Sequence, residues 1–88
     1  MRKVFPSPAF DRMVETFLKR NSAYEAKIAK TIDLLKKDCF HSLLKTHKLH
    51  GGLKNFYACF VGYDQRIIFK IVNNEIILLA FGSHDKLY

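Results

Sequence analysis

Imidazole, ammonium and guanidinium groups stand at the ends of hydrophobic runs in the second half of the chain, between Leu44 and Tyr88. Imidazole titrates near neutral pH and can give or take a proton, while lysine and arginine bind anions. A run of apolar residues buried in a sheet holds such groups at fixed spacings. The ends of these runs are therefore the candidate sites for chemistry.

The stretch from Cys39 to Lys54 is strongly basic: it holds three histidines and three lysines, and no acidic residue. Gly51-Gly52 breaks any helix there and allows a tight turn. Because no local carboxylate offsets the charge, the stretch predicts a loop of positive potential. Its candidate binding residues are Lys45, His47, Lys48, His50 and Lys54. The alternative is a solvated connection between a helix and a sheet.

Three β segments are predicted after this loop. They are Tyr57 to Val61, Gln65 to Val72 and Glu75 to Phe81, with a hairpin turn at Asn73-Asn74. Side chains alternate along a strand, so Arg66 and Lys70 point away from the face of Ile67. We expect helices to cover the Ile67 face, which leaves Arg66 and Lys70 on an open face where they could bind an anion. Alternatively, Arg66 is a surface residue paired with Asp64 or Glu75.

The ending from Gly82 to Tyr88 reads G-S-H-D-K-L-Y and follows a predicted buried strand directly. A strand holds the backbone at its exit, so His84 is well placed for chemistry. The alternative is a histidine that caps a helix or forms a hydrogen bond in a C-terminal turn. The residues by themselves favour neither interpretation.

The elements before the basic stretch must position these groups. Arg2 to Phe5 is an expected edge strand, since Pro6 argues against a central position. Ser7 and Pro8 predict the start of a first amphipathic helix, which Asn21 can end.

A second amphipathic helix is predicted to run to about Lys37. Ser22 and Glu25 have the spacing of a capping box at its start. The two helices form a helical hairpin, and each needs a partner for its apolar face. The fold class predicted is therefore α+β: a small antiparallel sheet packed against an N-terminal two-helix hairpin, in the order β-α-α-β-β-β.

The composition sets limits on the kind of protein. A chain of 88 residues predicts one domain, residues 1–88, and its formal charge of +7 favours an anionic partner. Cys39 and Cys59 are too few for a disulfide framework and are expected to be reduced. No signal peptide or membrane-spanning run is visible, so a cytoplasmic location is expected.

Three motifs, L-K-T-H-K-L-H-G, Y-D-Q-R-I-I-F and G-S-H-D-K-L-Y, complete this order of elements. With them, essentially the whole chain resembles the YafQ branch of the RelE/ParE superfamily, toxins of bacterial and archaeal type II toxin–antitoxin systems. The resemblance implies a small antiparallel sheet packed on two helices. It also implies an activity, since YafQ- and RelE-type toxins cut messenger RNA in the ribosomal A site, whereas ParE-type relatives poison DNA gyrase.

The resemblance implies roles for individual residues. His47 matches the histidine of the family's H-x-L-x-G loop, and His84 matches that of the G-[ST]-H motif. Asp64 matches the acidic residue before the strand, and Arg66 the arginine that faces the RNA phosphate. Tyr88 matches a terminal aromatic that can stack on a base or supply a phenol.

Three positions depart from the family pattern. Phe60 stands where the best-known YafQ toxin has another catalytic histidine, Gln65 replaces a tryptophan, and Ala80 replaces an arginine. These departures remove a proton-transfer group and a phosphate-binding charge, for which Arg66, His50 or Lys54 could compensate.

The implied function is a ribosome-dependent mRNA endonuclease, in which the ribose 2′-hydroxyl attacks the adjacent phosphate. The hypothesis assigns His84 as general acid, His47 or Asp64 as general base, and Arg66 with Lys54 as phosphate clamp. The RNA-binding residues would be Lys45, Lys48, His50, Lys54, Lys70 and Tyr88. No metal or cofactor is required, because no cysteine or carboxylate completes a good zinc set with the histidines.

Two other functions stay open at this point. One is a gyrase-inhibiting binding module on the same fold, and the other is a catalytically silent RNA- or protein-binding relative, which Phe60 and Ala80 suggest. The ending with His84 and Tyr88 favours the nuclease. The implied partners are a cognate antitoxin with a partly disordered, often acidic segment, and the ribosome with its mRNA, with no membrane involved.

Overall fold

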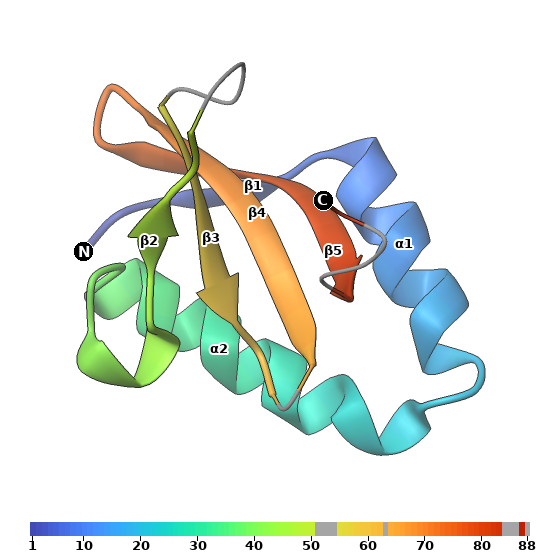
Figure 1. The fold of residues 1–88 in the computed structure, drawn as a ribbon. Coiled ribbons are helices and arrows are strands. Elements are labelled where there is room, and N and C mark those ends of the chain that lie inside the picture. The colour runs from blue at the N-terminus through green and yellow to red at the C-terminus, as the bar shows by residue number, and fades with distance from the viewer. Residues whose placement is uncertain (51–54, 63, 84–86, 88) are drawn as a thin grey trace.

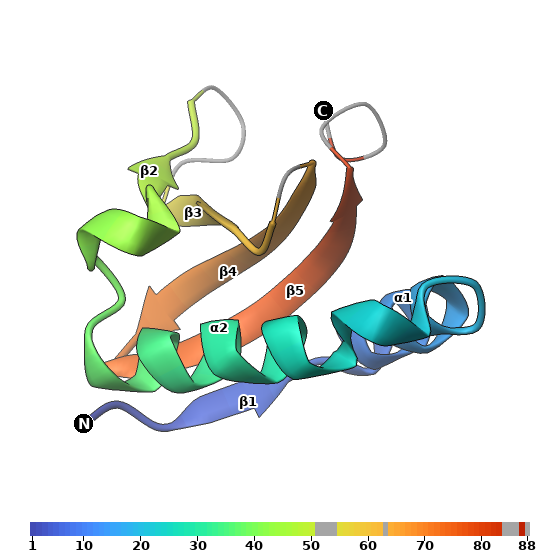
Figure 2. The ribbon, with the colours of Figure 1, turned by 90° about the horizontal axis from the view of Figure 1, so that it is seen from below.

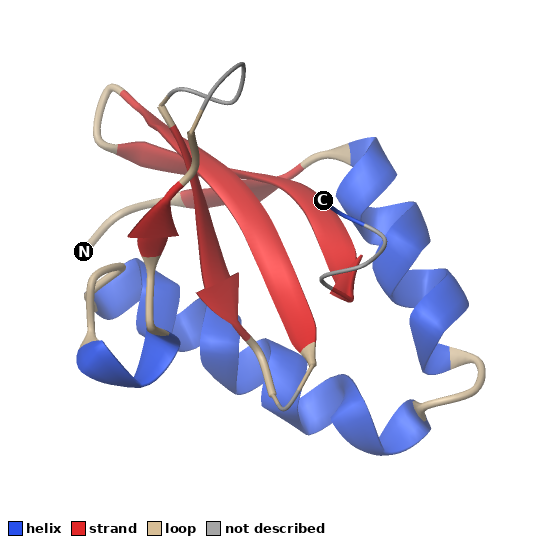
Figure 3. Ribbon diagram, viewed as in Figure 1, coloured by secondary structure: helices blue, strands red, loops and turns tan. Residues whose placement is uncertain are grey.

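The computed structural model describes residues 1–50, 55–62, 64–83 and 87. A sheet lies against two helices, and Figure 1 follows the chain through them from blue to red. Figure 3 distinguishes helix from strand in the same view. The elements are β1 (Val4–Pro6), α1 (Pro8–Leu18), a 3₁₀ turn (Ser22–Tyr24), α2 (Glu25–Lys37), a second 3₁₀ turn (Ser42–Leu44), β2 (His47–Lys48), β3 (Phe56–Phe60), β4 (Gln65–Val72) and β5 (Glu75–Ser83).

The described residues form a five-stranded sheet in the order β1-β5-β4-β3-β2. From β2 to β5 every neighbouring pair is antiparallel, whereas β1 runs parallel to β5. The predicted α+β fold and the edge position of the first strand are confirmed. The sheet is nevertheless mixed, because most of the chain separates β1 from β5 and no tight hairpin imposes antiparallel pairing on them. Strand β2 is an addition within the predicted basic loop.

Helix α1 begins as the sequence predicts. The Ser7 hydroxyl accepts a hydrogen bond from the Phe10 N–H at 3.1 Å, and Pro8 occupies the first turn, where no donor is needed. The buried Phe10 ring meets Phe81 of β5 edge-on, with centroids 6.4 Å apart. The Ser7 N–H also donates to the Leu78 carbonyl at 2.9 Å. These contacts attach the start of α1 to β5.

The predicted capping box of the second helix is wrong. Ser22 lies inside a 3₁₀ turn, and α2 begins at Glu25 after Tyr24, whose side chain makes no capping hydrogen bond. The Tyr24 N–H donates to the Asn21 carbonyl at 3.0 Å. A backbone hydrogen bond of the 3₁₀ turn therefore satisfies an N–H group that a capping side chain would otherwise have accepted from. Tyr24 packs edge-on against Phe17 at 5.2 Å, and this contact favours the turn over an earlier helix start.

The main core lies between the helices and the sheet. Ile67 and Phe69 of β4 are fully buried in one cluster with Ile28 and Leu35 of α2, and Ile71 packs against that cluster. Figure 2 shows α2 running along this side of the sheet. The prediction that the helices cover the Ile67 face is therefore confirmed.

Both cysteines are buried, free thiols of this core. Burial raises the pKa of Cys59 to about 12. Burial also raises the pKa of Cys39, although its neighbour Arg2, whose Nη1 donates to Cys39 Sγ at 2.6 Å, acts in the opposite direction. A thiol with a raised pKa is a poor nucleophile at neutral pH, so the two cysteines serve packing.

The β4–β5 hairpin is the longest pairing in the sheet. Its turn, Asn73-Asn74, has φ values of 52° and 67°, which confirms the predicted turn of residues that tolerate positive φ. The register shifts between Ile68 and Phe69, which leaves Leu79 as an extra residue on β5. Such a bulge bends a strand and turns side chains toward new neighbours. Here it lets both Leu79 and Ala80 pack on the face opposite the helices.

Candidate functional site

The sheet face turned away from the helices, called the open face below, has a small apolar cluster of its own. Leu49, Ala58 and Ile68 are buried in it. Arg66 and Lys70 alternate with the buried Ile67 and Phe69 along β4, so they lie on the same face as Ile68. The prediction that these two cations lie on the open face is confirmed.

His47 lies on the open face at the edge strand β2. It pairs with Ala58 of β3, and paired residues of neighbouring strands point to the same side. The imidazole is exposed, and its Nδ1 lies 3.2 Å from the Lys45 carbonyl oxygen. In the tautomer whose Nδ1–H donates to that carbonyl, Nε2 keeps a lone pair and can accept a proton.

Arg66 pairs with Phe60, the last residue of β3. The Arg66 Cζ lies 3.9 Å from the centroid of the Phe60 ring, and the Lys45 Nζ lies 5.4 Å from the same centroid. Arg66 Nη1 is buried and has no hydrogen-bond partner within the described part of the chain. An unsatisfied buried donor costs free energy, and an anionic acceptor bound at this place would remove that cost.

Strand β3 brings these groups to one site. Ala58 and Phe60, the partners of His47 and Arg66, are two residues apart on β3 and therefore point to the same side. Two interstrand spacings of about 4.8 Å separate β2 from β4, so long side chains on both can reach a group bound over β3. Lys45 joins them at the Phe60 ring. The imidazole of His47 and the cations of Arg66 and Lys45 thus lie over the open face of β3.

Two predicted binding residues lie apart from this cluster. Lys48 pairs with Tyr57, so it points to the side of β2 opposite that of its neighbouring histidine. Lys70 is on the open face, but it pairs with Phe56, four residues along β4 from Arg66 or about 13 Å away. Neither lysine belongs to the group around Phe60, because the strand register separates them from it.

The remaining predicted residues are placed only in part. Asp64 is exposed just before β4, and His50 is exposed just after β2. Arg66, for which a pairing with Asp64 was one interpretation, stacks instead on Phe60. The predicted His84, Lys54 and Tyr88 lie outside the described residues.

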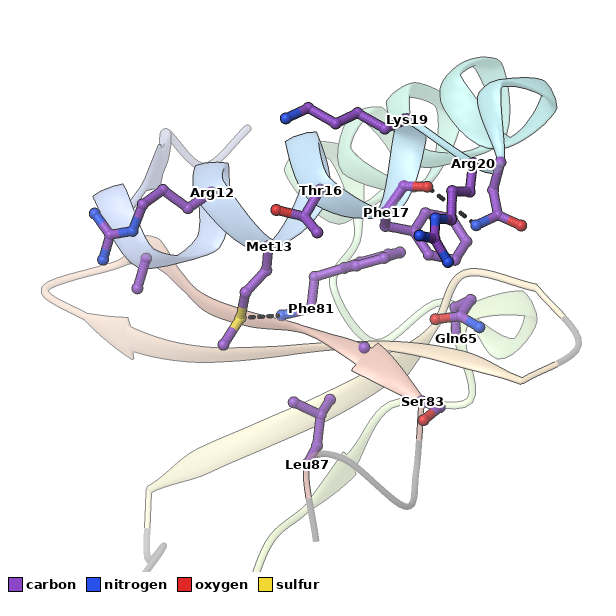
Figure 4. A pocket seen from close by; sticks show the side chains of 13 residues that line it. Arg12, Met13, Thr16, Phe17, Lys19, Arg20, Gln65, Phe81, Ser83 and Leu87 are labelled. Carbon is purple, nitrogen blue, oxygen red and sulfur yellow. Dashed lines mark hydrogen bonds between the residues drawn. The ribbon is translucent and has the colours of Figure 1, made fainter.

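A basic groove runs between α1 and the end of β5 (Figure 4). Its volume is about 1050 Å³, and the lining residues that belong to the described part of the chain include no acidic one. Arg12, Lys19 and Arg20 supply its charge, and Met13 and Phe81 lie between the helix and the strand. The Phe81 N–H donates to Met13 Sδ at 3.4 Å, a weak acceptor.

This groove, called the α1 groove from here on, was not predicted from the sequence. The available signal was the spacing of Arg12, Thr16 and Lys19, which puts them on one flank of a helix. That spacing is equally typical of a solvated helix face. The flank forms one side of a groove only because β5 lies close to it in the folded structure.

Among residues 1–50, 55–62, 64–83 and 87, no group of three His, Cys, Asp or Glu side chains could hold a metal ion. No helix in the same ranges is both long and apolar enough to cross a membrane.

Two helices lie on one face of a mixed sheet, and an imidazole and cations lie on the other, so the class is that of small α+β proteins with a basic open sheet face. The particular family follows from the sequence. The model of the family described as "Bacterial toxin of type II toxin-antitoxin system, YafQ" matches residues 2–88, and the chain belongs to this family. The resemblance seen in the sequence is thereby confirmed. Curated proteins give no match.

Solved structures support the same fold. YafQ from E. coli strain BL21(DE3) matches with a TM-score of 0.83 at 19% identity, over 100% of this chain and 99% of that one. A copper-bound mutant toxin from Helicobacter pylori matches with a TM-score of 0.78 at 26% identity, over 100% of both chains. The E. coli DinJ-YafQ toxin-antitoxin complex matches with a TM-score of 0.81 at 20% identity, over 99% and 97% of the two chains.

Proposed function

We propose that the chain is a ribosome-dependent mRNA endonuclease that works without a metal ion. The observation that supports this most is the cluster around β3, where His47, Arg66 and Lys45 share the open face. Proton-transfer groups and cations are what cleavage of an RNA phosphodiester requires. Membership of a toxin family and a net charge of +7 favour the same substrate.

The reaction uses the RNA's own nucleophile. The ribose 2′-oxygen attacks the adjacent phosphorus while His47, or alternatively Asp64, takes its proton. Arg66 and Lys45 stabilise the charge that develops on the phosphorane. The bond from phosphorus to the 5′-oxygen breaks, and His84 protonates that oxygen. The products are a 2′,3′-cyclic phosphate and a free 5′-hydroxyl.

The other basic residues would hold RNA outside the reacting bond. Lys48 points to the other side of β2, and Lys70 lies about 13 Å along β4 from Arg66. These two lysines and the exposed His50 suit flanking phosphates of mRNA or ribosomal RNA. Such contacts add affinity without sequence information and weaken steeply with salt. Work on the ribosome also implies a cytoplasmic location.

An antitoxin is the proposed protein partner. The DinJ-YafQ complex from E. coli and the YoeB-YefM complex from Staphylococcus aureus have this fold with a partner chain. In this chain the α1 groove has three cations and the edge of β5 beyond β1, and no acidic residue lines it among those that the structure describes. An acidic segment that runs along this groove would meet both charge complementarity and backbone groups at the sheet edge.

The direct test compares the wild-type chain with His84→Ala after inducible expression, by mapping the 5′ ends of mRNA. New ends within codons are expected for the wild type, with loss of at least about 100-fold for the variant, as for a general acid. If His84→Ala cleaved mRNA at the same rate as the wild type, His84 would have no part in the mechanism.

A second measurement separates the competing function. DNA supercoiling by gyrase is followed in the presence of the purified chain. Unchanged supercoiling together with cut mRNA is the expected result. Inhibited supercoiling with intact mRNA would instead establish the gyrase-binding alternative.

A further inference from the structure

Phe60 receives both cation–ring contacts found among the described residues. It is the last residue of β3 and is partly buried on the open face. The Arg66 guanidinium carbon lies 3.9 Å from its centroid, and the Lys45 ammonium nitrogen lies 5.4 Å from it. Both distances are within the range of about 6 Å over which a cation is attracted to an aromatic face.

Three segments converge on this ring. Phe60 and Arg66 are cross-strand partners, so the sheet itself places the two side chains together. Lys45 arrives from the turn before β2, where its φ of 50° puts the backbone in the left-handed region. The meeting of these segments is a property of the folded sheet and its edge, not of any one segment.

The ring changes how the two cations behave. Two positive groups near each other repel, and each long side chain has many rotamers when it is free. The electron-rich face of a phenyl ring attracts both groups and restricts them. Contact with Phe60 thus offsets the repulsion between Arg66 and Lys45 and orders them before any anion arrives.

We propose that Phe60 is a positioning residue, whose ring holds Arg66 and Lys45 so that both contact one phosphate group of an RNA strand. This rests on the proposed function, because the phosphate would be that of the RNA bound over β3. The departure from the family histidine at this position is therefore more than the loss of a proton-transfer group. The phenyl ring organises the cations that the chemistry needs.

The test measures binding of an RNA oligonucleotide with 2′-O-methyl groups, which lacks the nucleophile and cannot be cut. Phe60→Leu is expected to bind about three- to tenfold more weakly, with a smaller slope of log affinity against log salt. Phe60→Tyr keeps the ring and restores the affinity. The matched control is Phe56→Leu, an aromatic residue on the same strand and face whose ring has no cation contact among the described residues.

Proton NMR of the Arg66 side chain supplies a readout that loss of packing alone would not produce. Its signals are expected to be shifted upfield by the ring in the wild type and in Phe60→Tyr, and to lose that shift in Phe60→Leu. Phe60→Met replaces Phe60→Leu if the latter does not fold. Equal affinity, salt dependence and Arg66 signals in the wild type and the ringless variant would overturn the proposal.

Cleavage of mRNA on programmed ribosomes, measured with the same proteins, separates this inference from the proposed function. A wild type whose RNA affinity depends on the Phe60 ring but that never cuts mRNA supports the positioning role and contradicts the nuclease. A wild type that cuts mRNA, with affinity and rate unaffected by Phe60→Leu, contradicts the positioning role and supports the nuclease.

Discussion

The open face and the α1 groove are both basic, yet they are built differently. On the open face, His47 and Arg66 project from paired strands, and Arg66 is packed on Phe60 with one guanidinium nitrogen buried. In the groove, Arg12, Lys19 and Arg20 are exposed side chains on or just after a single helix. The open face thus holds its charged groups in defined positions, whereas the α1 groove has several charged groups that are not fixed by packing.

This difference indicates different uses. Catalysis requires charges held close to the geometry of the transition state, which neighbouring strands and a packed ring provide. Exposed, flexible cations give complementarity to an acidic partner without demanding a fixed geometry. We therefore propose that the open face carries the chemistry and that the α1 groove binds the partner, and the following predictions test that division.

Arg66→Ala should have the largest effect. Loss of this charge is expected to reduce mRNA cleavage about 100- to 1000-fold, as for removal of one positioned stabilising group. Stability should change little, because the buried Nη1 has no hydrogen-bond partner among the described residues. Cleavage rates on programmed ribosomes and thermal unfolding provide the two measurements.

The matched control for that loss of charge is Lys30→Ala on the exposed side of α2. It removes one positive charge far from the cluster around β3 and should keep nearly all of the cleavage. Equal losses in the two variants would show that net charge, rather than the position of Arg66, governs activity.

Reversal of the groove charges should have an intermediate effect. With Arg12→Glu, Lys19→Glu and Arg20→Glu combined, affinity for the antitoxin is expected to fall about 10- to 150-fold, at the cost of about 0.5–1 kcal/mol for each rim charge. Cleavage by the free toxin should change by less than about threefold, because the groove lies apart from β3. Calorimetry and the ribosome assay measure these two quantities.

An equal reversal elsewhere provides the comparison. Lys3→Glu, Lys30→Glu and Lys37→Glu change three exposed lysines and give the same net charge. This variant should keep most of its antitoxin affinity. Should the groove variant instead lose cleavage and keep the antitoxin, the roles of the two surfaces would be reversed.

The smallest effect concerns the helix that forms the groove wall. Ser7→Ala removes the hydroxyl that caps α1 and should lower the free energy of unfolding by about 1 kcal/mol. Ser22→Ala should leave that free energy nearly unchanged, since Ser22 caps no helix. Urea unfolding of both variants measures these free energies. A larger decrease in the free energy of unfolding for Ser22→Ala than for Ser7→Ala would show that Ser22 does cap the second helix.

The sequence predicted the parts of the fold that depend on neighbours along the chain. The cap at Ser7, the turn at Asn73-Asn74 and the alternation of Arg66 with Ile67 are local patterns, and all three are confirmed. The box at Ser22 failed because contact of Tyr24 with Phe17 favours a tighter turn. There a contact between side chains seven residues apart outweighed the capping preference of Ser22.

The candidate site was predictable in its members but not in its arrangement. Residue types and motifs pointed to His47 and Arg66 as functional residues. Their position on either side of β3 depends on the pairing of β2, a segment that the sequence predicts as loop. The sequence shows Phe60 only as the absence of a family histidine, since the contacts of its ring with two cations from other segments leave no pattern in the spacing of residues.

By itself, the order of residues determined the start of α1, the hairpin, the apolar face of β4, the family and the excess of positive charge. Tertiary structure alone decided that β1 lies parallel to β5, that a flank of α1 becomes a groove, and that Lys45, Phe60 and Arg66 meet. The physical reason is the separation along the chain over which each interaction acts. Backbone preferences and side-chain periodicity act over a few residues, whereas these contacts join segments that only the folded sheet brings together.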